Sequence, residues 1–387
     1  MHPLTLTRPK PLIRILNKTI IEHTLSSLKG IVSEAIIIVG YKKEMIEQHL
    51  GKTYDGIKIT YALQKEQLGT GHALLCAKQY LNKNENFLII PGDDLFSPVD
   101  IKNCINYSLC VLAKEVEDPE KWGIIYADSK GFITSIEEKP KNPKSKLAST
   151  GLMIMDYELI NLLEKEKKTE RGEIEVPSAL NKLIKKENVT CVKVKDYWLP
   201  IGYPWHILDA NELLLSRLKK SLIKGKIGKN VHIEGKIVLG YGSEILPGTY
   251  IEGNVFVGEN TKIGPNSYIR GSTTIGDNSK VGQGVEIKNS VIGNNSKVPH
   301  LSYVGDSVIG DNCNLGAGTI VANLRHNHEH VKTYVKNELV STGRKKFGTI
   351  IGDNVHTGIN TAIYPGRKIW PNIITMPGEI ISKDKVN

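Results

Sequence analysis

The sequence predicts an α/β domain over residues 1–222 and a solenoid of hexapeptide repeats over residues 223–387. Aliphatic side chains recur at every sixth position through the second half of the chain, and this period matches one short strand plus a turn. Strand-like and helix-like segments alternate through the first half, as is typical of α/β domains. A length of 387 residues suits two domains with sizeable cores.

The first half contains apolar runs that are typical of strands. They are Ile36–Val39, Ile57–Leu63, Phe87–Ile90, Leu109–Ala113, Gly123–Tyr126, Leu152–Met155 and Thr190–Val194. Helical patterns lie between them, at Ile20–Leu28, Lys43–Leu50, Gly71–Leu81, Tyr157–Lys165 and Val176–Lys186, and a last helix is expected at Tyr203–Lys220. This alternation predicts a largely parallel sheet, whose ligands bind in loops at the carboxyl ends of the strands.

The second half carries a ladder of aliphatic residues. Its uninterrupted part is Ile227, Ile233, Leu239, Ile245, Ile251, Val257, Ile263, Ile269, Ile275, Val281 and Ile287. After one-residue slips it resumes at Ile292 and again at Ile309, and it returns at Ile351. Three units form one triangular coil, and the inward side chains stack between coils because a single coil cannot bury them alone. By itself the repeat is also compatible with a spacer that has no chemistry.

Composition excludes several classes of function. The formal net charge is +10, but the lysines are spread along the chain and mixed with glutamates, which favours a solvated surface over nucleic-acid binding. A basic balance also helps to attract small anionic ligands. No segment reaches transmembrane length, and the N-terminus lacks the features of a signal peptide. The five cysteines are scattered without metal or disulfide spacing, so we expect a cytoplasmic protein without a membrane partner.

Four stretches of the first half have chemical promise. Prolines flank Lys10 and would hold it in a rigid loop. The segment from Gln64 to Ala73 is rich in amides and glycines, which suit the edges of a base. Asp93 follows an apolar strand, where a carboxylate suits Mg²⁺, although a turn or helix cap is the simpler alternative. The last stretch is Glu137-Glu138-Lys139-Pro140, which precedes Ser149-Thr150-Gly151.

Taken in this order, the four stretches resemble those of the sugar-1-phosphate nucleotidylyltransferases, a family with a Rossmann-like α/β fold. The resemblance implies in-line attack of a sugar 1-phosphate on the α-phosphate of UTP or dTTP, which depends on positioning and charge neutralisation. Lys10 and Lys139 would bind phosphates, and Asp93 would hold Mg²⁺. A pyrimidine base would be recognised by Gln64, Gln67, Gly69 and Thr70. The sugar would be faced by Gly123, Glu138 and Thr150.

Two departures from that family bear on this half. The first strand and glycine-rich loop that precede such a lysine segment are missing, so the neighbouring strands should have unpaired edges and an exposed apolar seam. We therefore expect the natural protein to start upstream of Met1; a stop codon in frame just before it, with no such loop encoded, would refute this. Moreover, Pro200 stands where relatives place a metal-binding Asp or Asn, and proline has no ligating side chain.

Polar clusters interrupt the solenoid at Tyr268–Arg270, Val285–Asn289, Pro299–Asp306 and Asn312–Asn323. Each alone is compatible with outward-facing turn residues, and a lone His300 with a surface or core histidine. As a set they resemble the acetyltransferase domain of the GlmU family, the bifunctional UDP-N-acetylglucosamine pyrophosphorylases and glucosamine-1-phosphate N-acetyltransferases. The segment HLSYVGDSVIGDNCNLGAGTIVANLR is especially close to the archaeal branch. The resemblance covers nearly the whole chain and implies a left-handed parallel β-helix that assembles as a homotrimer.

The GlmU resemblance also implies roles for individual residues. His300 would be the general base that takes a proton from the glucosamine amine as its nitrogen attacks acetyl-CoA, and a neutral imidazole suits this task. Arg270 and Lys288 would bind the sugar phosphate. Asn323 would position the acetyl group or stabilise the developing oxyanion. The sugar would be contacted by Tyr303 and Asn314, and the acetyl-CoA path would be lined by Ala317.

Residues 322–349 break the ladder with a polar insertion that contains His326, His328 and His330. Their spacing allows a metal site, but no set of carboxylates or cysteines accompanies them, so a solvated loop is favoured. Pro299 and Leu324 differ from bacterial relatives, and Leu324 removes a tyrosine contact to the sugar or acetyl group. The leading hypothesis is a bifunctional transferase of UDP-N-acetylglucosamine biosynthesis. The alternatives are an acetyltransferase with an inert first domain, a mannose-1-phosphate guanylyltransferase-like protein, and a regulatory scaffold with a purely structural solenoid.

Overall fold

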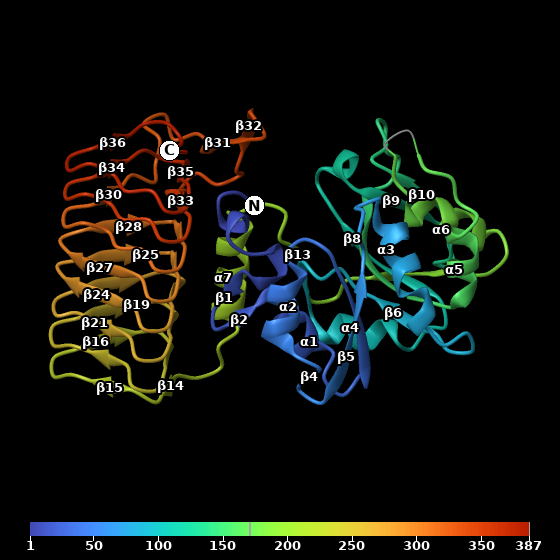
Figure 1. Ribbon diagram of the computed structural model, residues 1–387, viewed down its shortest axis with the longest axis horizontal. Coiled ribbons are helices and arrows are strands. Elements are labelled where there is room, and N and C mark those ends of the chain that lie inside the picture. Colours follow the sequence, from blue (N-terminus) through green and yellow to red (C-terminus); the bar gives the residue numbers. More distant parts are fainter. Residues whose placement is uncertain (170–171, 387) are drawn as a thin grey trace. The chain divides into compact units, whose positions relative to one another are not determined.

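The computed structural model describes residues 1–169 and 172–386, which form two compact units (Figure 1). The solenoid unit comprises Met1–Ile20 and Ile201–Asn387, and the α/β unit comprises Ile21–Pro200. The first twenty residues and helix α7 (His206–Ser216) therefore pack with the solenoid, although they precede the predicted boundary near residue 222. In the described residues, no helix is long and apolar enough to span a membrane.

The solenoid is a parallel β-helix whose coils lay short strands on three faces. Face 1 contains β14 (Leu222–Ile223), β17 (Ile237–Leu239), β20 (Val255–Val257), β23 (Thr273–Ile275), β26 (Val291–Ile292), β29 (Val308–Ile309), β33 (Thr349–Ile351) and β35 (Arg367–Ile369). Face 2 contains β15 (Lys226–Ile227), β18 (Glu244–Ile245), β21 (Lys262–Ile263), β24 (Lys280–Gln283) and β27 (Lys297–His300). Face 3 contains β16 (His232–Glu234), β19 (Tyr250–Glu252), β22 (Tyr268–Arg270), β25 (Glu286–Lys288), β28 (Tyr303–Gly305), β30 (Ile320–Val321), β34 (Ala362–Ile363) and β36 (Ile380–Ile381).

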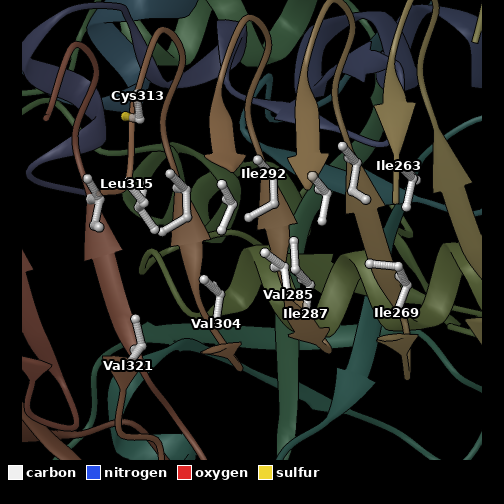
Figure 2. Close-up of a cluster of buried hydrophobic side chains, with 14 of the residues drawn as sticks. Ile263, Ile269, Val285, Ile287, Ile292, Val304, Cys313, Leu315 and Val321 are labelled. Carbon is white, nitrogen blue, oxygen red and sulfur yellow. The ribbon is translucent and has the colours of Figure 1, made fainter. Parts of the chain in front are cut away.

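The predicted aliphatic ladder forms the core of this β-helix, as Figure 2 shows. Ile263, Ile269 and Ile287 are fully buried, and each stacks on its equivalent in the next coil. Full burial of such a side chain stabilises the fold by about 1.5–3 kcal/mol. The predicted slips are also confirmed: Ile275 pairs with Ile292, which is closer in sequence than one regular coil. The repeat therefore sets both the core and the positions where the coil shortens.

The first residues of the chain lie against the solenoid within the same unit. They form two short 3₁₀ helices, η1 (Leu4–Leu6) and η2 (Lys10–Leu12), and a small hairpin of β1 (Arg14–Ile15) and β2 (Lys18–Thr19). The Arg8 guanidinium contacts Asp311 Oδ2 at 2.8 Å and Asp353 Oδ2 at 2.5 Å. On α7, Asn211 donates to the Ser272 carbonyl oxygen at 2.7 Å. These contacts tie both segments to the turns of the β-helix.

The predicted insertion leaves the β-helix between β30 and β33. Val308 of one coil pairs with Ile350 of the next, so the extra residues sit outside the ladder. Within them, β31 (Lys332–Val335) and β32 (Glu338–Ser341) form an antiparallel hairpin. His326, His328 and His330 are exposed, and the described residues include no cluster of three side chains that could hold a metal ion.

The α/β unit confirms most of the predicted elements. Its helices are α1 (Ile20–Ser27, which begins one residue before it), α2 (Lys43–Leu50), α3 (Thr70–Ala77), α4 (Pro98–Cys104), α5 (Tyr157–Leu163) and α6 (Val176–Ile184), with 3₁₀ turns η3 (Lys78–Tyr80) and η4 (Pro119–Lys121). Its strands are β3 (Glu34–Val39), β4 (Thr53–Tyr54), β5 (Ile57–Leu63), β6 (Phe87–Ile89), β7 (Asp94–Phe96), β8 (Cys110–Glu115), β9 (Gly123–Ala127), β10 (Ile133–Glu138), β11 (Leu147–Met155), β12 (Thr190–Lys193) and β13 (Trp198–Pro200).

The expectation of a largely parallel sheet is wrong for most of this unit. The six-stranded sheet has the order β10-β9-β11-β8-β12, with β6 also on β11, and in it β8 and β12 form the parallel pair. The other pairs are antiparallel because β9 and β10 are joined as a hairpin and β11 runs against β8, β9 and β6. Parallel pairing of the predicted kind also joins β3 to β5, in a separate sheet.

Two strands of the α/β unit, β3 and β6, have a hydrogen-bonded neighbour strand on only one side among the residues that the structure describes. Within the described chain, β3 pairs with β5 and β6 pairs with β11, and neither has a second neighbour. Both strands are apolar, yet Ile36, Ile38 and Leu88 are only partly buried, whereas the inner strands of a mainly parallel sheet are normally covered. Both strands therefore present one unpaired edge and a partly exposed apolar face within the described part of this unit.

Candidate functional site

Four of the site residues predicted in the solenoid, Arg270, Lys288, Tyr303 and Asn323, lie along face 3 and the corner that follows it. Arg270, Lys288 and Gly305 end β22, β25 and β28, and they stand in register on successive coils. Tyr303 pairs with Glu286 two positions earlier on the same strands. The fixed spacing of the β-helix thus places two cations and a phenol on one short stretch of its surface.

The corner after face 3 has a different residue type at the site than in the earlier coils. In those coils the corner residue is glycine, at Gly253 and Gly271. At the site it is Asn289 and then Asp306, which have a positive φ of 46° and 49°. Asn and Asp are the side-chain residues that best tolerate this conformation. The Asn289 amide donates to Asp306 Oδ1 at 3.0 Å, and Asn323 Nδ2 donates to Asp306 Oδ2 at 2.5 Å. Three polar side chains therefore form a column where the earlier coils have glycine.

Each predicted phosphate-binding cation has a carboxylate neighbour. Lys288 Nζ lies 2.8 Å from Asp306 Oδ2, and Arg270 Nε lies 2.7 Å from Glu286 Oε1. The hydrogen bond to Glu286 raises the pKa of Arg270, so this guanidinium stays charged. Such pairing fixes the direction of a cation while leaving its other N–H groups able to bind an anion.

Tyr303 reaches across its own strand to the corner. Its hydroxyl accepts a hydrogen bond of 3.0 Å from Asn323 Nδ2, and burial raises the pKa of the phenol. A Cβ at Gly305 would lie 2.5 Å from both the Tyr303 hydroxyl and Asn323 Nδ2. Glycine at position 305 is therefore required for these two side chains to meet.

His300 lies at the end of β27, one corner before face 3, and its side chain is exposed. Its carbonyl oxygen accepts from Ser302 Oγ at 2.7 Å and from the Gly318 N–H at 3.2 Å. The second bond brings the predicted acetyl-CoA residue Ala317, which precedes Gly318, over the His300 backbone. The segment that carries the imidazole is thus held by two neighbouring turns.

Asn314 lies apart from the hydrogen-bonded group. It continues face 2, where its backbone bridges Lys297 in one coil and His356 in the next. It therefore shares a face with His300 rather than with Tyr303 and Asn323.

The predicted base-binding loop of the α/β unit is held by the Gln64 side chain and by a backbone contact to Ile174. Gln64 Nε2 lies 3.2 Å from the Gly69 carbonyl oxygen, and the Gly71 N–H donates to Ile174 O at 2.9 Å. Gly69 has φ +93°, and a Cβ there would come within 2.7 Å of the same oxygen. Gln67 and Thr70 are exposed beside it. The loop is compact and leads directly into α3.

The predicted metal residue Asp93 sits in the turn between β6 and β7. This turn touches β11, since a Cβ at Gly151 would lie 2.7 Å from Pro91. Asp94 accepts from the Trp198 indole at 2.9 Å and pairs with Pro200 across β7 and β13. Pro200 therefore lies beside the turn that contains Asp93, across from Asp94.

The predicted sugar-facing residues differ in how they are positioned and in whether their side chains are buried. Gly123 pairs directly with Glu138, and Lys139 adopts φ +48° next to it with its Nζ 3.8 Å from Glu138. Thr150 is 3% exposed, and its hydroxyl donates to Leu112 O at 2.9 Å. Its side chain is thus held inside the sheet. Lys10 belongs to the solenoid unit, where it begins η2.

Three residues that organise the solenoid site had no role assigned from the sequence: Glu286, Asn289 and Asp306. The signal that finds two of them is the shortened coil, because the ladder slips by one residue just after Ile287 and again just after Val304. Each slip marks a corner where an Asn or Asp replaces the usual glycine.

The two units define a class: a nucleotidyltransferase-type α/β unit followed by a hexapeptide solenoid with a transferase-like polar site. Residues 1–217 match the family model described as nucleotidyl transferase, and residues 251–375 match the GMPPB C-terminal domain. The chain is 41% identical over 384 residues to the bifunctional protein GlmU of Methanocaldococcus jannaschii, covering 99% of this chain and 92% of that protein. It belongs to the family of bifunctional GlmU proteins.

Further relatives agree with this assignment. The bifunctional sugar-1-phosphate nucleotidylyltransferase/acetyltransferase of Sulfurisphaera tokodaii is 39% identical over 389 residues, with 99% of this chain and 94% of that protein covered. A solved structure described as a glucose-1-phosphate thymidylyltransferase from Bacillus anthracis is 26% identical, with a TM-score of 0.51 over 57% of this chain and 92% of that chain. The chain is therefore similar to two-activity proteins over nearly its whole length.

Proposed function

We propose that the solenoid transfers an acetyl group from acetyl-CoA to the amine of glucosamine 1-phosphate. The observation that carries this proposal is the group of Arg270, Lys288, Tyr303 and Asn323 on neighbouring coils, with an exposed His300 one corner before Tyr303. Two cations suit a phosphate, the phenol and amide suit sugar hydroxyls or an amine, and the imidazole suits proton transfer. Full-length relatives that carry an acetyltransferase in their name support this assignment.

In the proposed reaction, the amine nitrogen attacks the thioester carbonyl carbon of acetyl-CoA. A C–N bond forms, the C–S bond breaks, and CoA leaves with its sulfur. His300 takes the proton that the amine loses. Arg270 and Lys288 hold the phosphate, which fixes the sugar relative to the imidazole and lowers the entropic part of the barrier.

The test is release of free CoA from acetyl-CoA and glucosamine 1-phosphate. We expect His300→Ala to reduce the turnover number by about a hundredfold or more, within the usual contribution of a general base. Leu301→Ala, which trims an exposed neighbour, is the control and should keep wild-type turnover. Equal turnover of the His300 variant and wild type would exclude the base role.

For the α/β unit the proposed activity is transfer of a uridylyl or thymidylyl group from UTP or dTTP to a sugar 1-phosphate. Gln64, Gln67, Gly69 and Thr70 would bind the base. Asp93 fits Mg²⁺, because this ion commonly uses one or two carboxylates together with substrate phosphates. When bound, Mg²⁺ would neutralise charge on those phosphates, while Lys139 would contribute fixed positive charge. The product of both activities would be UDP-N-acetylglucosamine, and the solenoid would assemble as a homotrimer.

One observation favours a second candidate, an acetyltransferase whose α/β unit is inert. Pro200 pairs with Asp94 beside the metal turn and offers no ligand. Release of pyrophosphate from UTP and a sugar 1-phosphate separates the two candidates. If wild type releases none and Pro200→Asp restores release, the proline accounts for the inactivity; release by wild type would exclude the second candidate.

A further inference from the structure

The centre of the solenoid site is a buried carboxylate, that of Asp306. The residue is 2% exposed, and three donors reach its two oxygens. Asn289 donates to Oδ1, while Lys288 Nζ at 2.8 Å and Asn323 Nδ2 at 2.5 Å both donate to Oδ2. A carboxylate is favourable at such burial only when hydrogen bonds and an opposite charge satisfy it, and here both are present.

This carboxylate fixes which way the Asn323 amide faces. A carboxylate accepts hydrogen bonds, so the atom of Asn323 that lies against Asp306 must be the NH₂ group. The same Nδ2 donates to the Tyr303 hydroxyl at 3.0 Å, which uses both of its hydrogens. The amide oxygen of Asn323 is left as its acceptor, and the Tyr303 hydroxyl keeps its own proton to donate.

We propose that Asp306 is a positioning residue for acetyl transfer, which directs the Asn323 amide oxygen toward the substrate amine and the Lys288 ammonium toward the sugar phosphate. This inference rests on the proposed acetyltransferase function. In this arrangement Asn323 accepts a hydrogen bond from the nucleophile, and the oxyanion must find its donors elsewhere. The carboxylate acts only through these two side chains and touches no reacting atom.

Gly305 supplies an independent constraint on the same arrangement. It stands directly above Lys288 in the register of face 3, between the strand and the Asp306 corner. Because a Cβ there would lie 2.5 Å from both Asn323 Nδ2 and the Tyr303 hydroxyl, Gly305→Ala displaces these groups without altering the carboxylate. The two substitutions therefore perturb one geometry by different routes.

The test compares the steady-state kinetics of full-length wild type, Asp306→Asn and Gly305→Ala. An asparagine at position 306 offers one acceptor instead of two, so the donors around it can no longer all be satisfied. We expect kcat/KM for glucosamine 1-phosphate to fall about tenfold or more in both variants, since small misplacements of this kind are costly. The KM for acetyl-CoA should stay within about twofold of wild type, because the carboxylate contacts only residues on the sugar side.

Asp353→Asn is the matched control, since Asp353 is a buried carboxylate of the same solenoid that serves Arg8 and the Asp311 backbone. It should leave both kinetic constants unchanged. Wild-type kinetics in Asp306→Asn would overturn the inference. So would a loss of kcat/KM that is equal for glucosamine 1-phosphate and acetyl-CoA and that also occurs in Asp353→Asn. If Asp306→Asn does not fold, Gly305→Ala decides: the same selective loss supports the inference and wild-type kinetics refute it. An inactive wild type would instead refute the proposed function itself, and this inference with it.

Discussion

Replacing Lys288 by methionine should destabilise the solenoid markedly, although it removes only one charge. The lysine side chain is 17% exposed and that of Asp306 is 3% exposed, with 2.8 Å between Nζ and Oδ2. Removing one partner of a buried pair costs about 3–5 kcal/mol, because the other charge stays buried without compensation. Two amides still donate to Asp306, so we expect the lower end, about 3 kcal/mol.

A loss of this size lowers the melting temperature of a unit of this length by about 6–12 °C, at roughly 2–4 °C per kcal/mol. Thermal unfolding of Lys288→Met, followed by circular dichroism, measures it. The double variant Lys288→Met/Asp306→Asn should recover part of the loss, since it removes the uncompensated carboxylate. A single variant that melts within about 1 °C of wild type, or a double variant less stable than the single, would refute this reasoning.

Three further outcomes follow from the same structure. Arg8→Met removes ion pairs to Asp311 and Asp353, and the Arg8 side chain is about four-fifths buried. We expect this variant to lower the free energy of unfolding by about 1–3 kcal/mol and to speed hydrogen exchange in residues 1–20. Unchanged exchange there would contradict the role of Arg8 as an anchor. Ile269→Ala empties a fully buried ladder position and should cost about 2–5 kcal/mol in chemical denaturation, whereas a loss below about 1 kcal/mol would argue against a tightly packed core. Burial raises the pKa of the Cys313 thiol to about 12, so iodoacetamide at pH 8 should leave it unmodified until the chain unfolds, as read by mass spectrometry. Because the folded-state pKa is raised, the stabilising contribution of this thiol is complete below its ordinary pKa of about 8.5 and is lost as the pH rises toward 12.

The solenoid could be predicted closely from sequence because its period is a direct consequence of its geometry. The inward position that recurs every six residues must be aliphatic, so the core residues from Ile245 to Ile287 can be recognised by their fixed spacing in the sequence. The slips at Ile292 and Ile309 mark the shortened coils in the same way. The direction of a strand leaves no such mark, and the antiparallel course of β11 was therefore missed.

The site could be predicted only for side chains that the resemblance or their chemistry singles out. His300, Arg270 and Lys288 stand out as catalytic types that interrupt a repeat. In the sequence Asp306 has the pattern of an ordinary turn aspartate. Its proposed role depends on its burial and on three hydrogen-bond donors from other coils, which only the structure shows. The resemblance assigns Thr150 to the sugar, whereas in the structure its hydroxyl donates to Leu112 O inside the sheet. Such partners are set by packing between distant segments, which a local pattern does not encode.

Transfer of a labelled acetyl group is the direct test of whether the solenoid acetylates the amine of an amino-sugar phosphate. Wild type is incubated with trideuteroacetyl-CoA and glucosamine 1-phosphate, and the product is analysed by mass spectrometry and NMR. We predict that the labelled acetyl group appears on the sugar nitrogen and that His300→Ala yields almost none. No transfer by wild type, or a label found on a sugar oxygen, would show that the solenoid is not an amino-sugar N-acetyltransferase.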